Sequence, residues 1–259
     1  MPYFRTDRRN KLYYELIENI NASETLIFLH GWAETHRIWR NQIEYFKDDY
    51  QILILDLRGF GLSSKPAYGY SLKLQSKFLH KLIQELNLES YWLIGHSFGG
   101  MLSLQYCDRY FDEMNGAILI DTTYHIPTDI STLRNLGTFF ISKTLRQIWQ
   151  RTLKSIKLER QRILIQDLLH DIDSVPLYVS AACGVAALNL KVKLKSIMCP
   201  ILIIVGEHDE LTPVSLSKRM HENLPNSQLA IIKDTGHMSF IEKPDEINSI
   251  MATFLRQIK

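Results

Sequence analysis

The sequence predicts an α/β fold, in which parallel strands alternate with helices along the chain. Six short apolar runs are typical of strands buried on both faces of a sheet. They lie at residues 25–31, 51–59, 90–97, 116–122, 200–207 and 227–234. Amphipathic segments that favour helices lie between or after these runs, at 35–48, 71–87, 98–110, 213–223 and 244–258. The alternation predicts a mostly parallel sheet joined by right-handed crossovers.

The two ends of the chain show further signals. Residues 2–19 read as a hairpin with a polar turn, which predicts an antiparallel edge at the start of the sheet. Pro213 and Pro244 stand where the first turn of a helix should begin.

Residues 123–195 interrupt the alternation, because they contain helical patterns and no clear strand. We therefore predict a core formed by 1–122 and 196–259, with 123–195 inserted as a helical cap, or lid. The cap carries eleven Lys and Arg and five Asp and Glu, a net charge of +6, whereas the rest of the chain carries −4.

Composition excludes several classes of protein. The chain has 259 residues, of which 46% are apolar and 22% charged, as in ordinary globular proteins. The net charge of +2 and the short apolar runs favour neither a nucleic-acid partner nor a membrane span. The N-terminus lacks the apolar core of a signal peptide, and three widely spaced cysteines argue against a disulfide framework. We expect a cytoplasmic protein.

A candidate nucleophile lies in the stretch "GHSFG", which places Ser97 between Gly95 and Gly99. An apolar strand precedes it and a helical pattern follows, as in a nucleophile elbow. Side chains at either glycine would collide with neighbours in so tight a turn. The alternative is a glycine-rich turn with an incidental serine.

A serine nucleophile needs a base, and the base needs a carboxylate. His237 follows the strand at 227–234, and Asp209 follows the strand at 200–207, so both should lie at the carboxyl edge of the sheet. The chain order Ser97, Asp209, His237 is the one expected when a nucleophile elbow lies in this fold class. Asp121, after an earlier strand, is an alternative acid, and Glu207 is expected to turn away.

The developing oxyanion needs backbone donors. We expect these from Phe98, the residue after the nucleophile, and from Trp32, after the turn at His30-Gly31. Gly59-Phe60-Gly61 lacks the third glycine of a dinucleotide fingerprint, and no P-loop or metal pattern is present, so we expect no cofactor and no metal.

Together these motifs resemble the α/β-hydrolase superfamily over nearly the whole chain. The resemblance rests on "HGW" (30–32), "DLRGFGLS" (56–63), "GHSFGG" (95–100), "GEHDELTP" (206–213) and "GHMSFIEKPDEI" (236–247). It implies an eight-stranded sheet with helices on both faces, one antiparallel strand near the N-terminus and a cap before the last two strands. It also implies a serine-dependent reaction without a cofactor.

Within the superfamily, the chain looks like small serine carboxylesterases, including those that act on pimeloyl-acyl-carrier-protein methyl esters. We therefore expect hydrolysis of small or medium acyl esters through an acyl-enzyme. The expected pocket residues are His30, Phe139, Phe140, Trp149, Met238 and Phe240.

Alternatives stay open. The same three residues would serve thioester hydrolysis, carbon–carbon cleavage or lyase chemistry, and a ligand-binding sensor of this fold is a third interpretation. Basic cap residues would suit an acidic acyl carrier protein, although they could equally form a solvated helix face. They are Lys143, Arg146, Arg151, Lys154 and Lys157.

Overall fold

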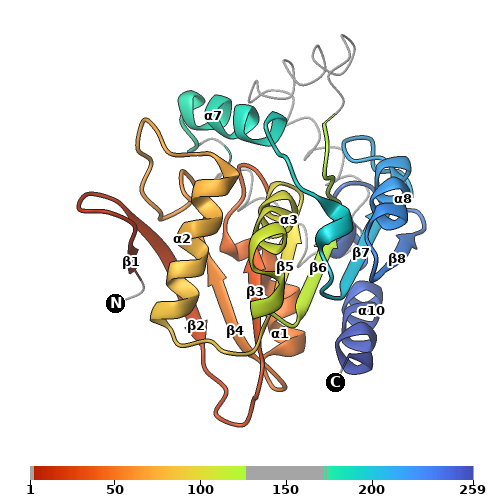
Figure 1. Ribbon diagram of the computed structural model, residues 1–259. Helices are drawn as coiled ribbons and strands as arrows, with labels where there is room; N and C mark the ends of the chain where they lie inside the picture. The colour runs from red at the N-terminus through yellow and green to blue at the C-terminus, as the bar shows by residue number, and fades with distance from the viewer. Residues whose placement is uncertain (1–2, 127–171, 173, 259) are drawn as a thin grey trace.

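The computed structural model describes residues 3–126, 172 and 174–258, and a sheet of eight strands runs through its centre (Figure 1). The strands lie in the order β1-β2-β4-β3-β5-β6-β7-β8. Their bounds are β1 Tyr3–Arg5, β2 Lys11–Ile17, β3 Thr25–Leu29, β4 Gln51–Leu55, β5 Tyr91–His96, β6 Gly116–Ile120, β7 Ile201–Gly206 and β8 Ser227–Ile232. β2 is antiparallel to both of its neighbours, β1 and β4. All other pairs of neighbouring strands are parallel. All six predicted strands and the N-terminal hairpin are therefore confirmed.

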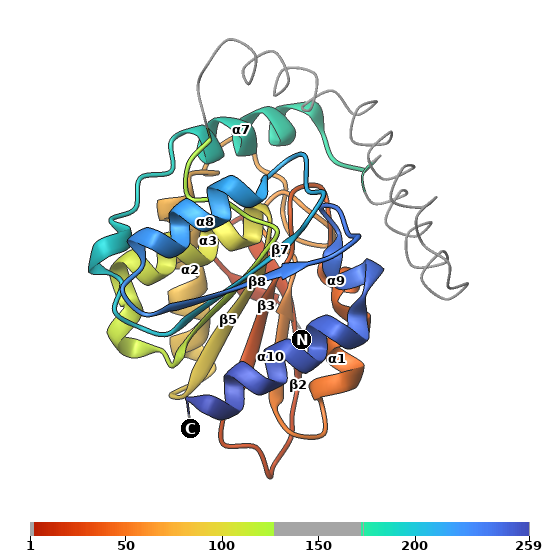
Figure 2. The same cartoon turned by 90° about the vertical axis from the view of Figure 1, so that its right-hand side faces the viewer.

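Helices cover both faces of the sheet, as Figure 2 shows most clearly. α2 (Leu72–Glu85), α3 (Phe98–Tyr110) and α8 (Val214–Asn223) lie on one face, and α1 (Arg40–Phe46) and α10 (Pro244–Gln257) lie on the other. Short helical turns occupy His36–Trp39, Phe111–Glu113, Leu194–Ser196 and α9 (Ser239–Glu242). Pro244 begins its helix as predicted, whereas Pro213 lies one residue before α8.

The central strands have the continuous apolar sequences that burial on two faces requires. Every residue of β3 is buried, as is every residue of β5, β6 and β7. β8 differs from the prediction of two-sided burial, because it is the edge strand and Ile231 is 40% exposed.

Part of the predicted cap lies within the described residues. α7 (Leu177–Leu188) falls in the inserted stretch, and Val179 of α7 lies against Gly59 in the loop that follows β4. The cap boundaries at 123 and 195 stay a prediction. The expected pocket residues Phe139, Phe140 and Trp149 lie outside the described residues.

The start of α3 packs directly against the end of β3. A Cβ added to Gly99 would lie 2.1 Å from the Leu29 carbonyl oxygen and 2.6 Å from that of His30. Both atoms belong to the backbone, so a side chain rotation cannot relieve the clash. Glycine at 99 is therefore what lets the helix begin beside the loop at 30–32, as the sequence pattern predicted.

We expect Gly99→Ala to lower the free energy of unfolding by about 1–3 kcal/mol, the usual cost of forcing extra atoms into a packed core. Urea unfolding would measure the change. Gly236→Ala is the matched control, because its added Cβ would meet nothing closer than Glu242 Oε1 at 3.6 Å. Equal effects of the two substitutions would contradict this account of the α3–β3 contact.

Candidate active site

Ser97 occupies a sharp turn between β5 and α3. Its φ of +49° lies in the left-handed region, which residues other than glycine adopt at a cost. The turn is fixed from both sides: the Ser97 N–H donates to the Ile120 carbonyl at 3.0 Å, and Thr122 Oγ1 donates to the Ser97 carbonyl at 2.6 Å. The backbone therefore holds the serine in place while its side chain stays free to react.

His237 lies directly beside this serine. Its Nε2 is 3.0 Å from Ser97 Oγ, and its Nδ1 is 2.9 Å from Asp209 Oδ2. An ionised carboxylate only accepts hydrogen bonds, so Nδ1 carries the proton and Nε2 is left to accept from the Ser97 hydroxyl. The structure thus brings together the three residues that the sequence singled out at positions 97, 209 and 237.

Asp209 is held at the end of β7 by its own loop. The N–H groups of Leu211 and Thr212 donate to Oδ1 at 2.8 and 2.9 Å, and Thr212 Oγ1 donates to Oδ2 at 2.6 Å. Burial raises the pKa of Asp209, but the charge and hydrogen bond of His237 and the Thr212 donors outweigh it and lower that pKa. Asp209 is therefore a fixed negative charge behind the imidazole.

That charge acts on His237 in turn. Burial by itself lowers the pKa of His237, but the charge of Asp209 and its hydrogen bond more than offset burial and raise that pKa. Asp121 and Glu34 add smaller contributions of the same sign. The site is therefore arranged to stabilise a protonated imidazole, the form that a general base acquires during proton transfer.

The alternative carboxylates of the sequence analysis do not contact the imidazole. Asp121 is fully buried, and it accepts hydrogen bonds from Gly206 and Ser239 instead. Glu207 is exposed and accepts from the Asp234 N–H at 3.2 Å, so it turns away as expected.

A buried pair behind His237 was missed by the sequence analysis. His96 Nδ1 lies 3.0 Å from Glu34 Oε2, and His96 Nε2 lies 3.0 Å from the His237 carbonyl oxygen. Glu34 Oε2 also accepts the Gly31 N–H at 2.6 Å. Glu34 and His96 thus join the loop after β3 to the main chain of His237. Nothing in their local sequence signals this contact, which joins residues 62 positions apart.

His30 was expected to line the pocket; it lies in the core of the described residues, and its contact with a substrate stays a prediction. The side chain is fully buried: its Nε2 accepts the Leu57 N–H at 2.9 Å, so its Nδ1 donates to the Gly31 carbonyl at 2.7 Å. Burial lowers the pKa of His30, which keeps it neutral. His30 therefore fixes the loop that carries Trp32.

The expected oxyanion donors lie on two segments that pack together. Phe98 is the first residue of α3, so its N–H has no intrahelical acceptor. Trp32 follows the turn that Gly99 approaches closely. Their pairing as an oxyanion hole stays a proposal.

Two other expected pocket residues are in the core of the described structure. Phe240 is fully buried between Trp39 and His96, with ring centroids 4.7 and 4.8 Å away. Its place in the pocket wall stays a prediction. Met238 is 2% exposed, and its contact with a substrate stays a prediction.

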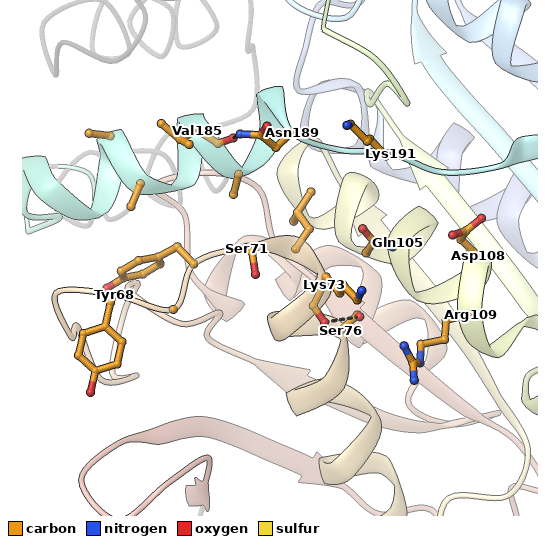
Figure 3. Close-up of a pocket in the computed structure, with 16 residues that line it drawn as sticks. Tyr68, Ser71, Lys73, Ser76, Gln105, Asp108, Arg109, Val185, Asn189 and Lys191 are labelled. Carbon is orange, nitrogen blue, oxygen red and sulfur yellow. Dashed lines mark hydrogen bonds between the residues drawn. The ribbon is translucent and has the colours of Figure 1, made fainter.

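A separate groove of about 940 Å³ lies between α7 and the α2–α3 pair (Figure 3). Its lining is largely apolar and also includes the charged residues Lys73, Asp108, Arg109 and Lys191. Neither Ser97 nor His237 lines it. The groove is thus distinct from the reactive serine.

The described residues include one group of side chains that could ligate a metal. Glu207, His208 and Asp234 have ligand atoms within 4.8 Å of one another, but all three are exposed, and exposed acidic groups commonly lie together without an ion. We assign them no metal. No helix in the described ranges is both long and apolar enough to cross a bilayer.

Comparisons with known proteins agree with this fold. Residues 24–143 match the family described as "alpha/beta hydrolase fold", and 185–259 match one described as "TAP-like protein". The AB hydrolase superfamily protein YisY of Bacillus subtilis is 26% identical over 97% of this chain and 98% of its own length. A pimeloyl-[acyl-carrier protein] methyl ester esterase of Legionella pneumophila is 26% identical over 89% of this chain and 95% of its own.

Among solved structures, a thermophilic esterase from Thermogutta terrifontis superposes with a TM-score of 0.81 at 23% identity. The match covers 99% of this chain and 97% of the esterase chain. At that identity the likeness establishes the fold.

We expect His237 to titrate above its ordinary value of 6.5, because Asp209 stabilises the protonated ring. Asp209→Asn should lower the titration midpoint of His237, because burial then lowers its pKa without the opposing charge of Asp209. Histidine ring resonances followed by NMR against pH would measure both proteins, with the exposed substitution Asp245→Asn as control. A midpoint that is the same with and without Asp209 would contradict the pairing.

Proposed function

Because this chain belongs to the α/β-hydrolase superfamily, we propose that it is a serine esterase that cleaves carboxylic esters through an acyl-enzyme. One observation carries the proposal: the hydrogen-bonded series from Ser97 Oγ to His237 Nε2, at 3.0 Å, and from His237 Nδ1 to Asp209, at 2.9 Å. A hydroxyl, a base within reach of it and a carboxylate that orients the base are the parts that nucleophilic acyl transfer requires.

In the first half-reaction, Ser97 Oγ attacks the ester carbonyl while His237 Nε2 takes the hydroxyl proton. The imidazolium that forms is stabilised by Asp209, whose position is fixed by Thr212. His237 then gives the proton to the leaving alcohol, and the acyl group stays on Ser97. In the second half-reaction, water gives a proton to His237 as it attacks the acyl carbonyl. The bond between the acyl carbon and Ser97 Oγ then breaks, His237 returns the proton to Oγ, and the acid is released.

The N–H groups of Trp32 and Phe98 are the proposed donors to the oxyanion. Phe98 also places the positive end of the α3 dipole near the developing charge. Losing one such donor typically lowers kcat by about a hundredfold to a thousandfold. The tight fit of Gly99 against the loop after β3 keeps the two donors at a fixed separation.

Small or medium acyl chains are the proposed substrates, with the cap supplying the apolar pocket. This part of the proposal rests on the sequence alone, which places the aromatic residues Phe139, Phe140 and Trp149 in the predicted cap. We place the enzyme in the cytoplasm, since Cys107, Cys183 and Cys199 are buried free thiols, as in proteins of reducing compartments.

Ser97→Ala should lower ester hydrolysis by at least about a thousandfold, because no other group replaces the nucleophile. Release of p-nitrophenol from p-nitrophenyl butyrate would measure the change. The matched control is Ser71→Ala, which removes the hydroxyl that caps α2 and should cost about 1 kcal/mol of stability without loss of activity. Substantial hydrolysis by Ser97→Ala would show that another residue is the nucleophile.

A finer version of the proposal is a carrier-protein substrate. The relative from Legionella pneumophila is named for a methyl ester linked to acyl carrier protein, and the predicted cap has a net charge of +6. Lysines and arginines at positions 143–157 would attract an acidic carrier, in a manner that salt screens.

For a carrier-linked methyl ester, kcat/KM should therefore fall as the NaCl concentration rises from 0.05 to 0.5 M, roughly the range over which screening becomes strong. Hydrolysis of the uncharged p-nitrophenyl butyrate serves as the control and should change little. Lys154→Glu should weaken the salt dependence. Equal salt responses of the two substrates would remove the carrier-protein proposal and leave the esterase proposal standing.

A further inference from the structure

Asp121 is a fully buried carboxylate at the end of β6 that the mechanism above does not use. Its φ of +46° lies in the left-handed region, where aspartate is tolerated better than most residues. The Asp121 N–H donates to the Ile204 carbonyl at 2.9 Å, so its backbone is anchored to β7. A strained and buried charge of this kind needs a structural reason to exist.

The two oxygens of Asp121 bind two different segments of the chain. Oδ1 accepts the Gly206 N–H at 2.9 Å, and Oδ2 accepts the Ser239 N–H at 3.0 Å and the Ser239 hydroxyl at 2.7 Å. Gly206 ends β7 three residues before Asp209, and Ser239 follows His237 by two residues. One carboxylate thus connects the segment that carries the acid to the segment that carries the base.

We propose that Asp121 is a positioning residue, which ties the Asp209 segment to the His237 segment and so sets the distance between His237 Nε2 and Ser97 Oγ. The inference rests on the function proposed above and assigns it a further residue. Asp121 acts through Ser239 and Gly206 and does not touch the reacting atoms.

Other contacts leave little slack between these two segments. The His208 N–H donates to the Thr235 carbonyl at 2.9 Å, and a Cβ added to Gly206 would lie 2.2 Å from the Gly236 carbonyl oxygen. The His237 carbonyl is held from the opposite side by His96 Nε2. In so tight an arrangement, losing the Asp121 connection must move the imidazole or strain its neighbours.

Asp121 also contributes charge to the site. The groups that bear on His237 are Asp209, Asp121 and Glu34, whose charges raise its pKa, and His96, whose ring lies 5.0 Å away between centroids. Burial and the charge of Asp209 raise the pKa of Asp121 itself to about 6, against the opposing charges of His237 and His96. Above that pH the ionised carboxylate stabilises the protonated base.

Asp121→Asn is the test, because it keeps the shape of the side chain and removes its charge. An amide has one acceptor oxygen, so one of the two segments then faces an NH₂ group in place of an acceptor. We expect kcat for p-nitrophenyl butyrate to fall by on the order of tenfold to a hundredfold, as small displacements of reacting groups do, with little change in KM. The NMR titration midpoint of His237 should move to lower pH.

Asp56→Asn is the matched control. Asp56 is also a buried carboxylate at the end of a strand, and it accepts from the N–H and Nδ1 of His36 and from the Leu62 N–H. It should lower the melting temperature without changing the His237 titration or kcat. Ser239→Ala keeps the Asp121 charge and removes one hydrogen bond, so it should lower kcat while the His237 midpoint stays close to that of the wild type.

Unchanged kcat and an unchanged His237 midpoint in Asp121→Asn would overturn the inference. So would a fall in kcat that Asp56→Asn reproduces at equal loss of stability. If wild-type protein hydrolyses no ester, the proposed function fails separately. The His237 titration and a crystal structure of Asp121→Asn still decide the positioning role, since neither needs turnover. The role would be refuted if the variant kept both the wild-type titration midpoint of His237 and the wild-type distance between His237 Nε2 and Ser97 Oγ.

Discussion

The sharp turn at Ser97 is the constraint on which the rest of the site depends. It holds a non-glycine residue at a φ of +49°, a conformation that costs about 1–3 kcal/mol. The turn persists because its surroundings allow no other path: Gly99 lies against the Leu29 and His30 carbonyls, and Ser97 is bonded on both sides to the end of β6. The packing of the core thus holds Ser97 in a strained backbone conformation at the point where its hydroxyl must be exposed to react.

The remaining groups meet the serine because parallel strands end at one edge of the sheet. The segments that follow β6, β7 and β8 supply Asp121, Asp209 and His237, in that order. Three carboxylates, Asp121, Asp209 and Glu34, are buried within this small region together with His96, beside the partly buried ring of His237. The charges of these carboxylates raise the pKa of His237, so the same charges that stabilise its protonated form also raise the pH at which it becomes neutral.

The order of strands and helices could be predicted because apolar periodicity and glycine positions report local backbone requirements. Ser97, Asp209 and His237 were also predictable, since each follows a strand. The contacts of Glu34 with His96 and of Asp121 with Ser239 were not, because they join residues 62 and 118 positions apart through side-chain direction. For the same reason the sequence did not show that the rings of His30 and Phe240 turn into the core.

The account requires Ser97 to be the group that carries the acyl intermediate. Mass spectrometry of peptides from protein treated with a fluorophosphonate probe tests this most directly, because the probe stays on an activated serine. The account predicts modification of Ser97, and little of it once His237 is replaced by alanine. Modification of a different residue that leaves Ser97 unmodified would contradict it, and so would full ester hydrolysis by protein whose Ser97 carries the probe.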